Sequence, residues 1–242
     1  MSKIPGAAAG QPVASAEAWQ TARAALLAEE KALTRAADRV AALRREMPWQ
    51  KVETGYRFMT PNGAAGLADL FGGRRQLIVY HHMLRAADPA PCSGCGMLAD
   101  QLPRLSHLHA RDTALTLVSR APLAEIEAFR SRMGWQLPWA ETLDSFNADF
   151  GMGTHGPGFT VFIRDGGAIY HSYTCTARET ERAATVWGLL DMTPLGRQEL
   201  WQAAPAWVAQ TAPYQWWRLH DEYAALPRQA LLPRPLAAPP EF

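Results

Sequence analysis

Residues 76–95 read QLIVYHHMLRAADPAPCSGC, and this stretch decides the fold. Its first part, Gln76 to Leu84, is a dense apolar run with Ile, Val and Tyr, which is typical of a strand buried in the middle of a sheet. After the loop 85–91, a helix pattern begins at Cys92, and Cys95 follows one turn later. We therefore expect a Cys-x-x-Cys pair at the N-terminus of a helix that directly follows a central strand.

A second strand and a second helix are predicted after the cysteine pair. Pro103 falls inside the first helix pattern, so we expect it to kink or divide that helix. Residues 113–119 (TALTLVS) have the pattern of a strand. The next helix begins with Pro122 at its first position and ends at Gly134, a typical C-terminal stop. The Trp-rich stretch 134–151 that follows is predicted to be irregular.

A β-hairpin and a last helix complete the central region. Residues 159–164 and 168–174 flank Asp165-Gly166-Gly167, which is a strong turn signal. The segment 176–190 begins with the Thr-x-x-Glu spacing of a capping box and is predicted to be a helix. The full order is then β-α-β, a connecting helix and loop, and β-β-α. This is the order of the thioredoxin fold, so we expect a thioredoxin-like α/β domain over residues 49–190.

The N-terminal region, residues 1–48, is predicted to be an addition to this domain. Residues 1–14 are mostly small residues with Gly and Pro and indicate a disordered lead, and a helix pattern without Gly or Pro covers residues 15–47 until Pro48 ends it. Apolar residues recur every seven positions along this helix: Trp19, Leu26, Leu33, Val40 and Met47. This stripe either packs on the protein's own core or forms an oligomer contact, and the second alternative predicts a homodimer.

Two further segments complete the organisation of the chain. Residues 49–59 are predicted to be a strand or hairpin arm that turns at residues 61–63, and residues 67–71 a short helical turn. The C-terminal extension, residues 191–242, is rich in Trp and Pro. Because indoles left in water form a costly apolar patch, we expect this extension to pack on the core.

Composition and charge exclude several classes of function. The 242 residues carry a formal net charge of +1 and their basic residues are scattered, so neither nucleic acid nor an anionic membrane is expected as a partner. The sequence has no signal-peptide pattern at its start and no apolar run of about 18 residues. Three cysteines suit a reducing compartment, and we expect a cytoplasmic protein without a bound cofactor.

Several segments of the sequence resemble the DUF899 family of thioredoxin-like proteins. They are residues 56–58 (YRF), 66–71 (GLADLF), 73–83 (GRRQLIVYHHM), 92–95 (CSGC), 118–122 (VSRAP), 132–135 (RMGW), 138–139 (PW), 146–150 (FNADF) and 190–194 (LDMTP). The resemblance covers roughly residues 45–225, and its His-His-Met and Met-Gly-Trp runs are distinctive. It implies a thioredoxin-like fold and a dithiol–disulfide oxidoreductase activity.

The cysteine pair itself indicates thiol–disulfide exchange. A thiolate at a helix N-terminus is stabilised by unpaired backbone N–H groups, so its pKa falls below that of a free cysteine. Cys92 would therefore be the exposed nucleophile, and Cys95, one turn later and partly buried, would resolve the mixed disulfide. The partner would be an unidentified protein disulfide or a small-molecule disulfide.

Other roles for the pair stay open at this point. The cysteines and a strand histidine could ligate zinc, although no fourth ligand is evident because Cys175 should lie at the far end of the hairpin. Peroxide reduction is not expected, since Pro89 stands three residues before Cys92, where a peroxidatic site needs Thr or Ser. The alternative from a different class is a thioredoxin-fold binding or assembly module in which the cysteines are incidental.

Two adjacent histidines end the predicted central strand. Because side chains alternate along a strand, His81 and His82 should point to opposite faces of the sheet. One of them could lie beneath the cysteines and relay a proton for Cys95. The structural alternative is a core histidine that hydrogen-bonds to a backbone carbonyl.

Overall fold

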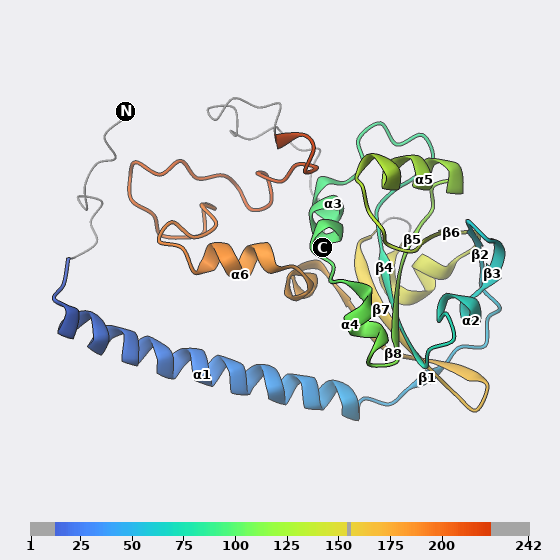
Figure 1. The fold of residues 1–242 in the computed structure, drawn as a ribbon, viewed down its shortest axis with the longest axis horizontal. Coiled ribbons are helices and arrows are strands. Elements are labelled where there is room, and N and C mark those ends of the chain that lie inside the picture. The colour runs from blue at the N-terminus through green and yellow to red at the C-terminus, as the bar shows by residue number, and fades with distance from the viewer. Residues whose placement is uncertain (1–12, 154–155, 224–242) are drawn as a thin grey trace.

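The computed structural model describes residues 13–153 and 156–223, so most of the predicted disordered lead and residues 224–242 of the C-terminal extension lie outside the described residues. The described elements follow one another along the chain as shown in Figure 1. They are α1 (Ala16–Glu46), β1 (Gln50–Lys51), β2 (Arg57–Thr60), β3 (Gly63–Gly66), α2 (Leu67–Leu70), β4 (Gln76–His81), α3 (Ser93–Asp100), α4 (Leu105–His109), β5 (Thr113–Ser119), α5 (Leu123–Arg132), β6 (Trp139–Thr142), an irregular helical turn (Ala148–Met152), β7 (Gly158–Asp165), β8 (Ala168–Thr176), a 3-10 helix (Ala177–Ala183) and α6 (Thr185–Asp191).

The strands of the described residues form one eight-stranded sheet in the order β1-β8-β7-β4-β5-β6-β2-β3. At its centre, β4 is parallel to β5 and antiparallel to β7, and β7 forms the predicted hairpin with β8. A βαβ unit flanked by an antiparallel hairpin is the thioredoxin arrangement. The thioredoxin-like fold predicted from the sequence is therefore confirmed.

The central strand β4 is buried on both faces because its apolar residues alternate between two cores. Leu77 and Val79 face a core that is rich in phenylalanine, with Phe146 and Phe162 at its centre. Tyr80 faces the other core, which α3 and α5 cover with several apolar residues, among them Met97, Leu98, Ile126 and Phe129. This second face of the sheet carries the cysteine pair.

A strand that the sequence did not reveal lies inside the Trp-rich stretch. Residues 134–151 were predicted to be irregular, but β6 pairs parallel with β5 and antiparallel with β2. The Leu117↔Trp139 register aligns the first residue of β6 with the middle of β5. Four residues are too few to show a period-two pattern beside Pro138, so only tertiary pairing reveals this strand. Its effect is to join the β2–β3 hairpin to the central sheet.

The helices around the sheet differ from the prediction at two places. Pro103 does divide the first helix, into α3 and α4. The last helix is also divided, into a 3-10 segment and α6, which was not predicted. Thr176 makes no side-chain capping hydrogen bond because it ends β8, where it pairs with Gly158. Pro122 is the cap residue before α5 rather than its first helical residue.

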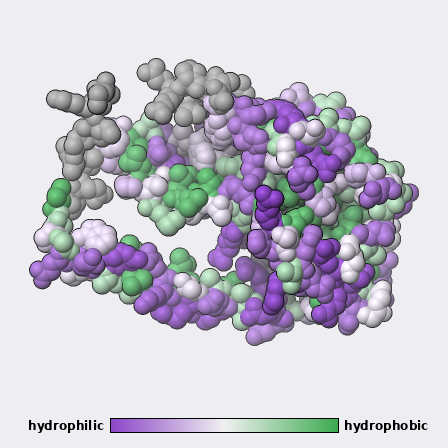
Figure 2. All heavy atoms as spheres, in the orientation of Figure 1, coloured by the Kyte–Doolittle hydropathy of each residue, from purple (hydrophilic) through white to green (hydrophobic). Residues whose placement is uncertain are grey.

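Helix α1 has the predicted length but is not covered by the protein's own core. Ser15 caps it by accepting a hydrogen bond from the Ala18 N–H at 3.2 Å. None of its residues is buried, and Leu33 of the apolar stripe is 70% exposed. In Figures 1 and 2 the helix runs along the outside of the molecule as a largely polar rod. Packing of the stripe on this chain's own core is therefore not found, and the homodimer stays a prediction.

The C-terminal extension divides into covered and exposed parts. Leu219 is buried, and Trp216 and Trp217 pack against the core that contains the cysteines. Trp201 and Trp207 remain exposed, contrary to the expectation that the whole extension packs down. Figure 2 shows apolar residues gathered over α6, where Leu189 and Met192 are exposed.

Candidate active site: the Cys92–Cys95 dithiol

Cys92 occupies the cap position of α3, directly before the first helical residue. Its Sγ accepts a hydrogen bond from the backbone N–H of Cys95 at 3.4 Å, and its carbonyl accepts one from Gly96 at 3.0 Å. The first N–H groups of a helix have no partner inside the helix, so a sulfur at this position satisfies one of them. Cys92 is half-buried, whereas Cys95 is buried; both are free thiols.

The two thiols differ in acidity. The pKa of Cys92 is lowered, mainly because the Cys95 thiol donates a hydrogen bond to its sulfur, with further help from the backbone N–H groups of Cys95 and Gly94. Burial and the Asp88 carboxylate oppose this shift without cancelling it. The pKa of Cys95 is raised well above its usual value, first by burial and then by the neighbouring Cys92. Cys92 is therefore the first of the pair to become a thiolate.

Tyr80 of β4 lies directly against the buried cysteine. Its hydroxyl donates a hydrogen bond to Cys95 Sγ and so partly offsets the rise in the pKa of that thiol. Burial raises the pKa of Tyr80 itself well above its ordinary value of 10, so the phenol keeps its proton. The sequence analysis missed this residue, although the alternation of β4 could have placed it on the helix-covered face.

His81 lies on the other face of the sheet, away from α3. Its Nδ1 is 3.2 Å from Oδ1 of Asn147 and its Nε2 is 3.0 Å from Oγ1 of Thr160, while its ring stacks on Phe146. Burial lowers the pKa of His81 to about 4, so the ring is neutral at neutral pH. His81 thus has the environment of a core histidine with two side-chain partners.

His82 lies on the face that also carries the cysteines. Its ring sits in an aromatic cluster, with its centroid 4.6 Å from that of Trp139 and also close to Phe129 and Trp135. Its backbone N–H donates to Val118 and its carbonyl accepts from the Ser119 hydroxyl. The predicted opposite orientations of the two histidines are therefore observed, and a proton-relay role for His82 stays a prediction.

The third cysteine packs against the same core as Cys92 and Cys95, which differs from the expected position at the far end of the hairpin. Cys175 is half-buried on β8 opposite Phe159, and burial raises the pKa of its thiol. Within residues 13–153 and 156–223, no group of three or more His, Cys, Asp or Glu side chains is arranged to hold a metal ion. In the same described ranges, no helix is both long and apolar enough to cross a membrane.

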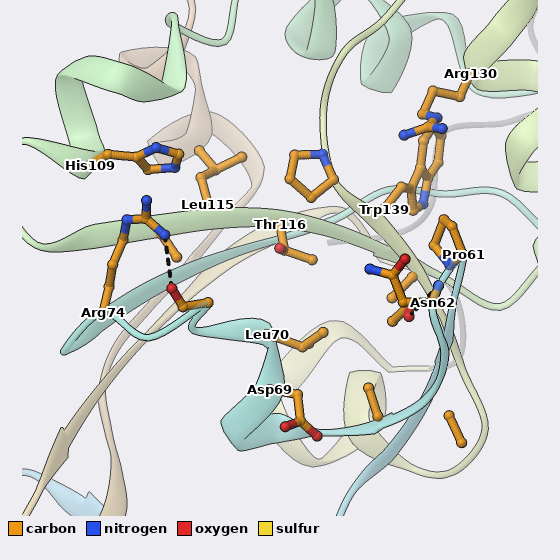
Figure 3. Close-up of a pocket in the computed structure, with 17 residues that line it drawn as sticks. Pro61, Asn62, Asp69, Leu70, Arg74, His109, Leu115, Thr116, Arg130 and Trp139 are labelled. Atoms are coloured by element: carbon orange, nitrogen blue, oxygen red, sulfur yellow. Dashed lines mark hydrogen bonds between the residues drawn. The ribbon is translucent and has the colours of Figure 1, made fainter.

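A hollow of about 620 Å³ lies elsewhere, between α2, β3 and the strands β5 and β6 (Figure 3). Arg74 and Arg130 lie on its rim, but Arg74 donates to the Gly72 carbonyl and Arg130 pairs with Glu127. Neither Cys92 nor Cys95 lines this hollow, so it is separate from the dithiol.

A family model described as a bacterial protein of unknown function, DUF899, matches residues 8–223. The chain belongs to the DUF899 family. The match includes α1, the whole sheet and the described part of the C-terminal extension. The family model therefore covers both α1 and this part of the extension in addition to the thioredoxin-like domain. The family resemblance inferred from the sequence is confirmed. No curated protein sequence matches this DUF899 chain.

Solved structures of thioredoxin-like proteins are similar to parts of the chain. A Bacteroides thetaiotaomicron protein provisionally described as a protein disulfide isomerase is 16% identical, with a TM-score of 0.40, over 60% of this chain and 92% of that chain. A mutant of PrxQ from Xylella fastidiosa is 12% identical, with a TM-score of 0.40, over 56% and 92%. BsSco, a member of the Sco family of cytochrome c oxidase assembly proteins, is 15% identical, with a TM-score of 0.34, over 58% and 96%. At these scores none of them bears on the activity of this DUF899 protein.

Proposed function

We propose that this protein is a thiol–disulfide oxidoreductase in which Cys92 is the nucleophile and Cys95 the resolving thiol. The observation that carries the proposal is the asymmetry of the pair. Cys92 Sγ caps α3, 3.4 Å from the Cys95 N–H, and has a lowered pKa, while Cys95 is buried and has a raised one. A low-pKa, partly exposed thiolate beside a protonated thiol is the arrangement that this exchange requires.

The exchange proceeds in two steps. The Cys92 thiolate attacks one sulfur of the substrate disulfide, an S–S bond forms between them, and the other substrate sulfur leaves as a thiolate that takes up a proton. Cys95 then loses its proton and attacks Cys92 Sγ, which breaks the mixed disulfide and releases the second substrate thiol. Two electrons pass from the protein dithiol to the substrate, and the protein is left with a Cys92–Cys95 disulfide.

Tyr80 acts in the second step of this mechanism. Cys95 must become a thiolate in a buried place, where the charged form is disfavoured. The Tyr80 hydroxyl donates to Cys95 Sγ and remains protonated because of its raised pKa. A neutral donor at this position stabilises the negative charge that develops on the resolving sulfur.

A single-turnover experiment tests this function without an added reductant. Reduced protein, freed of excess reductant, is mixed with hydroxyethyl disulfide, and the protein thiols are counted after quenching. We expect wild type and the Cys175→Ser control to lose both active-site thiols and Cys92→Ser to lose none through this route. Equal thiol loss in Cys92→Ser and wild type would contradict the proposal.

The exposed stripe of α1 supports a second proposal, a homodimer formed through that helix. Trp19 is 56% exposed and Leu33 is 70% exposed, and a second copy would supply an equivalent apolar stripe to cover them. Light scattering of the full chain should give the mass of a dimer, and Leu26→Glu with Leu33→Glu should give a monomer. A monomeric full chain at micromolar concentration would contradict this assembly.

A further inference from the structure

The two glycines next to the cysteines, Gly94 and Gly96, are each in close contact with the C-terminal extension. A Cβ atom on residue 94 would lie 2.2 Å from Cζ3 of Trp217. A Cβ atom on residue 96 would lie 2.5 Å from Cδ2 of Leu219. Real Cβ atoms do not approach heavy atoms this closely, so only glycine lets these side chains lie on α3.

Polar contacts hold the residues that follow Trp217. Arg132 donates two hydrogen bonds to the Asp221 carboxylate, at 2.7 and 2.9 Å, and Nδ1 of His220 lies 2.6 Å from Oδ1 of Asp100. A two-point Arg–carboxylate pair fixes direction as well as distance. Leu219, which directly precedes these two contact residues, is 2% exposed. Residues 214–222, which we name the strap, are therefore attached to α3 and α5.

The indole of Trp217 also contacts two other aromatic rings. Its centroid is 4.6 Å from that of Tyr214 and 5.6 Å from that of Trp187 of α6. The buried Glu199 carboxylate accepts hydrogen bonds from the Tyr214 N–H at 3.0 Å and from the Trp216 indole at 2.9 Å. The ring contacts of Trp217 and the hydrogen bonds of its neighbours Tyr214 and Trp216 leave the indole little freedom to move aside.

We propose that the strap, through Trp217, is the specificity-determining element of the dithiol and restricts it to disulfides of low molecular weight. Gly94 is two residues from Cys92 on the first turn of α3, so the indole covers the surface beside the nucleophile. A disulfide inside a folded protein brings backbone on both sides of its sulfurs and needs this surface to dock. A small disulfide needs only an approach to Cys92 Sγ itself. The substrate class depends on the proposed function, whereas the restricted access to Cys92 does not.

Alkylation with reagents of two sizes measures this access directly. The rate for Cys92, read by mass spectrometry, is compared for iodoacetamide and for a polyethylene-glycol maleimide. In wild type we expect the bulky reagent to be selectively slowed, and in Trp217→Ala its rate relative to iodoacetamide should rise by about tenfold. Trp207→Ala removes an exposed indole of the same extension and should leave the ratio unchanged. Equal ratios in wild type and Trp217→Ala would overturn the proposal.

A second variant guards against a general loss of structure in Trp217→Ala. Asp221→Asn keeps the indole but removes the charge that pairs with Arg132, so the strap should detach more often and the ratio should rise in the same direction. Thermal unfolding followed by circular dichroism shows whether each variant keeps its fold. A folded Asp221→Asn with the wild-type ratio would contradict the role of the strap.

Substrate turnover separates the strap from the reaction. Wild type should oxidise its dithiol faster with hydroxyethyl disulfide than with insulin, and Trp217→Ala should narrow that difference. If neither disulfide reacts with wild type or any variant, but the alkylation ratio still rises in Trp217→Ala, the proposed function is wrong. The restriction of access to Cys92 by the strap is then still supported. If both react but the difference is the same in Trp217→Ala, the strap is not the specificity element.

Discussion

Tyr80 of β4 and Cys95 of α3 are buried in the same core, where hydrogen bonding by the Tyr80 hydroxyl opposes the rise that burial causes in the pKa of Cys95. This contact connects the central strand to the resolving thiol rather than to the nucleophile. The thiolate that most needs stabilisation is the one that must form away from water. Tyr80 should therefore affect the second step of the exchange and leave the first unchanged.

The variant Tyr80→Phe tests this division of labour. Loss of a hydrogen bond to a charged group, worth about 1.5 kcal/mol, should slow the resolution of the mixed disulfide by about tenfold. Alkylation of Cys92 should keep its wild-type rate. Stopped-flow release of the second thiol from a chromogenic disulfide measures the resolving step, and Tyr170→Phe on β8 serves as the matched control. A slower first step with unchanged resolution would contradict the assigned role.

The pH dependence of Cys92 reactivity follows from its partner. The Cys95 thiol donates to Cys92 Sγ and is the largest cause of the lowered pKa of Cys92. Cys95→Ala removes this donor, so the pKa of Cys92 should rise and the alkylation midpoint should move to higher pH. The rate of iodoacetamide labelling as a function of pH gives both midpoints. A midpoint that stays in place, or falls, would show that the backbone N–H groups alone stabilise the thiolate.

His81 should make the fold sensitive to mild acid. Its pKa is about 4 in the folded protein and about 6.5 when unfolded, so between these values the unfolded chain binds more protons. The contribution of His81 to the free energy of unfolding should be fully present above pH 6.5. The free energy of unfolding should then fall by about 3 kcal/mol as the pH decreases towards 4. His81→Leu should weaken this pH dependence, whereas His107→Gln on the exposed side of α4 should preserve it. Urea unfolding at pH 7 and at pH 5 gives the change in the free energy of unfolding between the two pH values. An equal change in wild type and His81→Leu would show that His81 is not the source of the acid sensitivity.

The parts of the fold that could be predicted are those with a local pattern. The apolar run of β4, the Gly166-Gly167 turn and the Pro103 break each depend on neighbouring residues. Strand β6 was missed because its four residues become a strand only by pairing with β5 and β2. The division of the last helix was missed because Thr176 pairs in β8 instead of capping.

The candidate site shows the same limit. Cys92 and Cys95 are recognisable because spacing and helix position are local properties of the sequence. Tyr80 was overlooked since an apolar run with a tyrosine is also what a simple core strand requires. The strap could not be predicted, because its contacts with α3 join residues that are distant in the sequence. Asp100 and His220, for example, are 120 positions apart. No periodicity relates Trp217 to Gly94.

The assignment of Cys92 as nucleophile and Cys95 as resolving thiol is tested most directly by trapping the intermediate. Cys95→Ser keeps the nucleophile and removes the group that releases the substrate, so a mixed disulfide should accumulate on Cys92. Intact-mass spectrometry after exposure to hydroxyethyl disulfide should show one adduct, located on Cys92 and removed by dithiothreitol. The same treatment of Cys92→Ser should give no adduct on Cys95. An adduct on Cys95 in Cys92→Ser would contradict the account. So would Cys95→Ser with no adduct, or with an adduct on Cys175 alone.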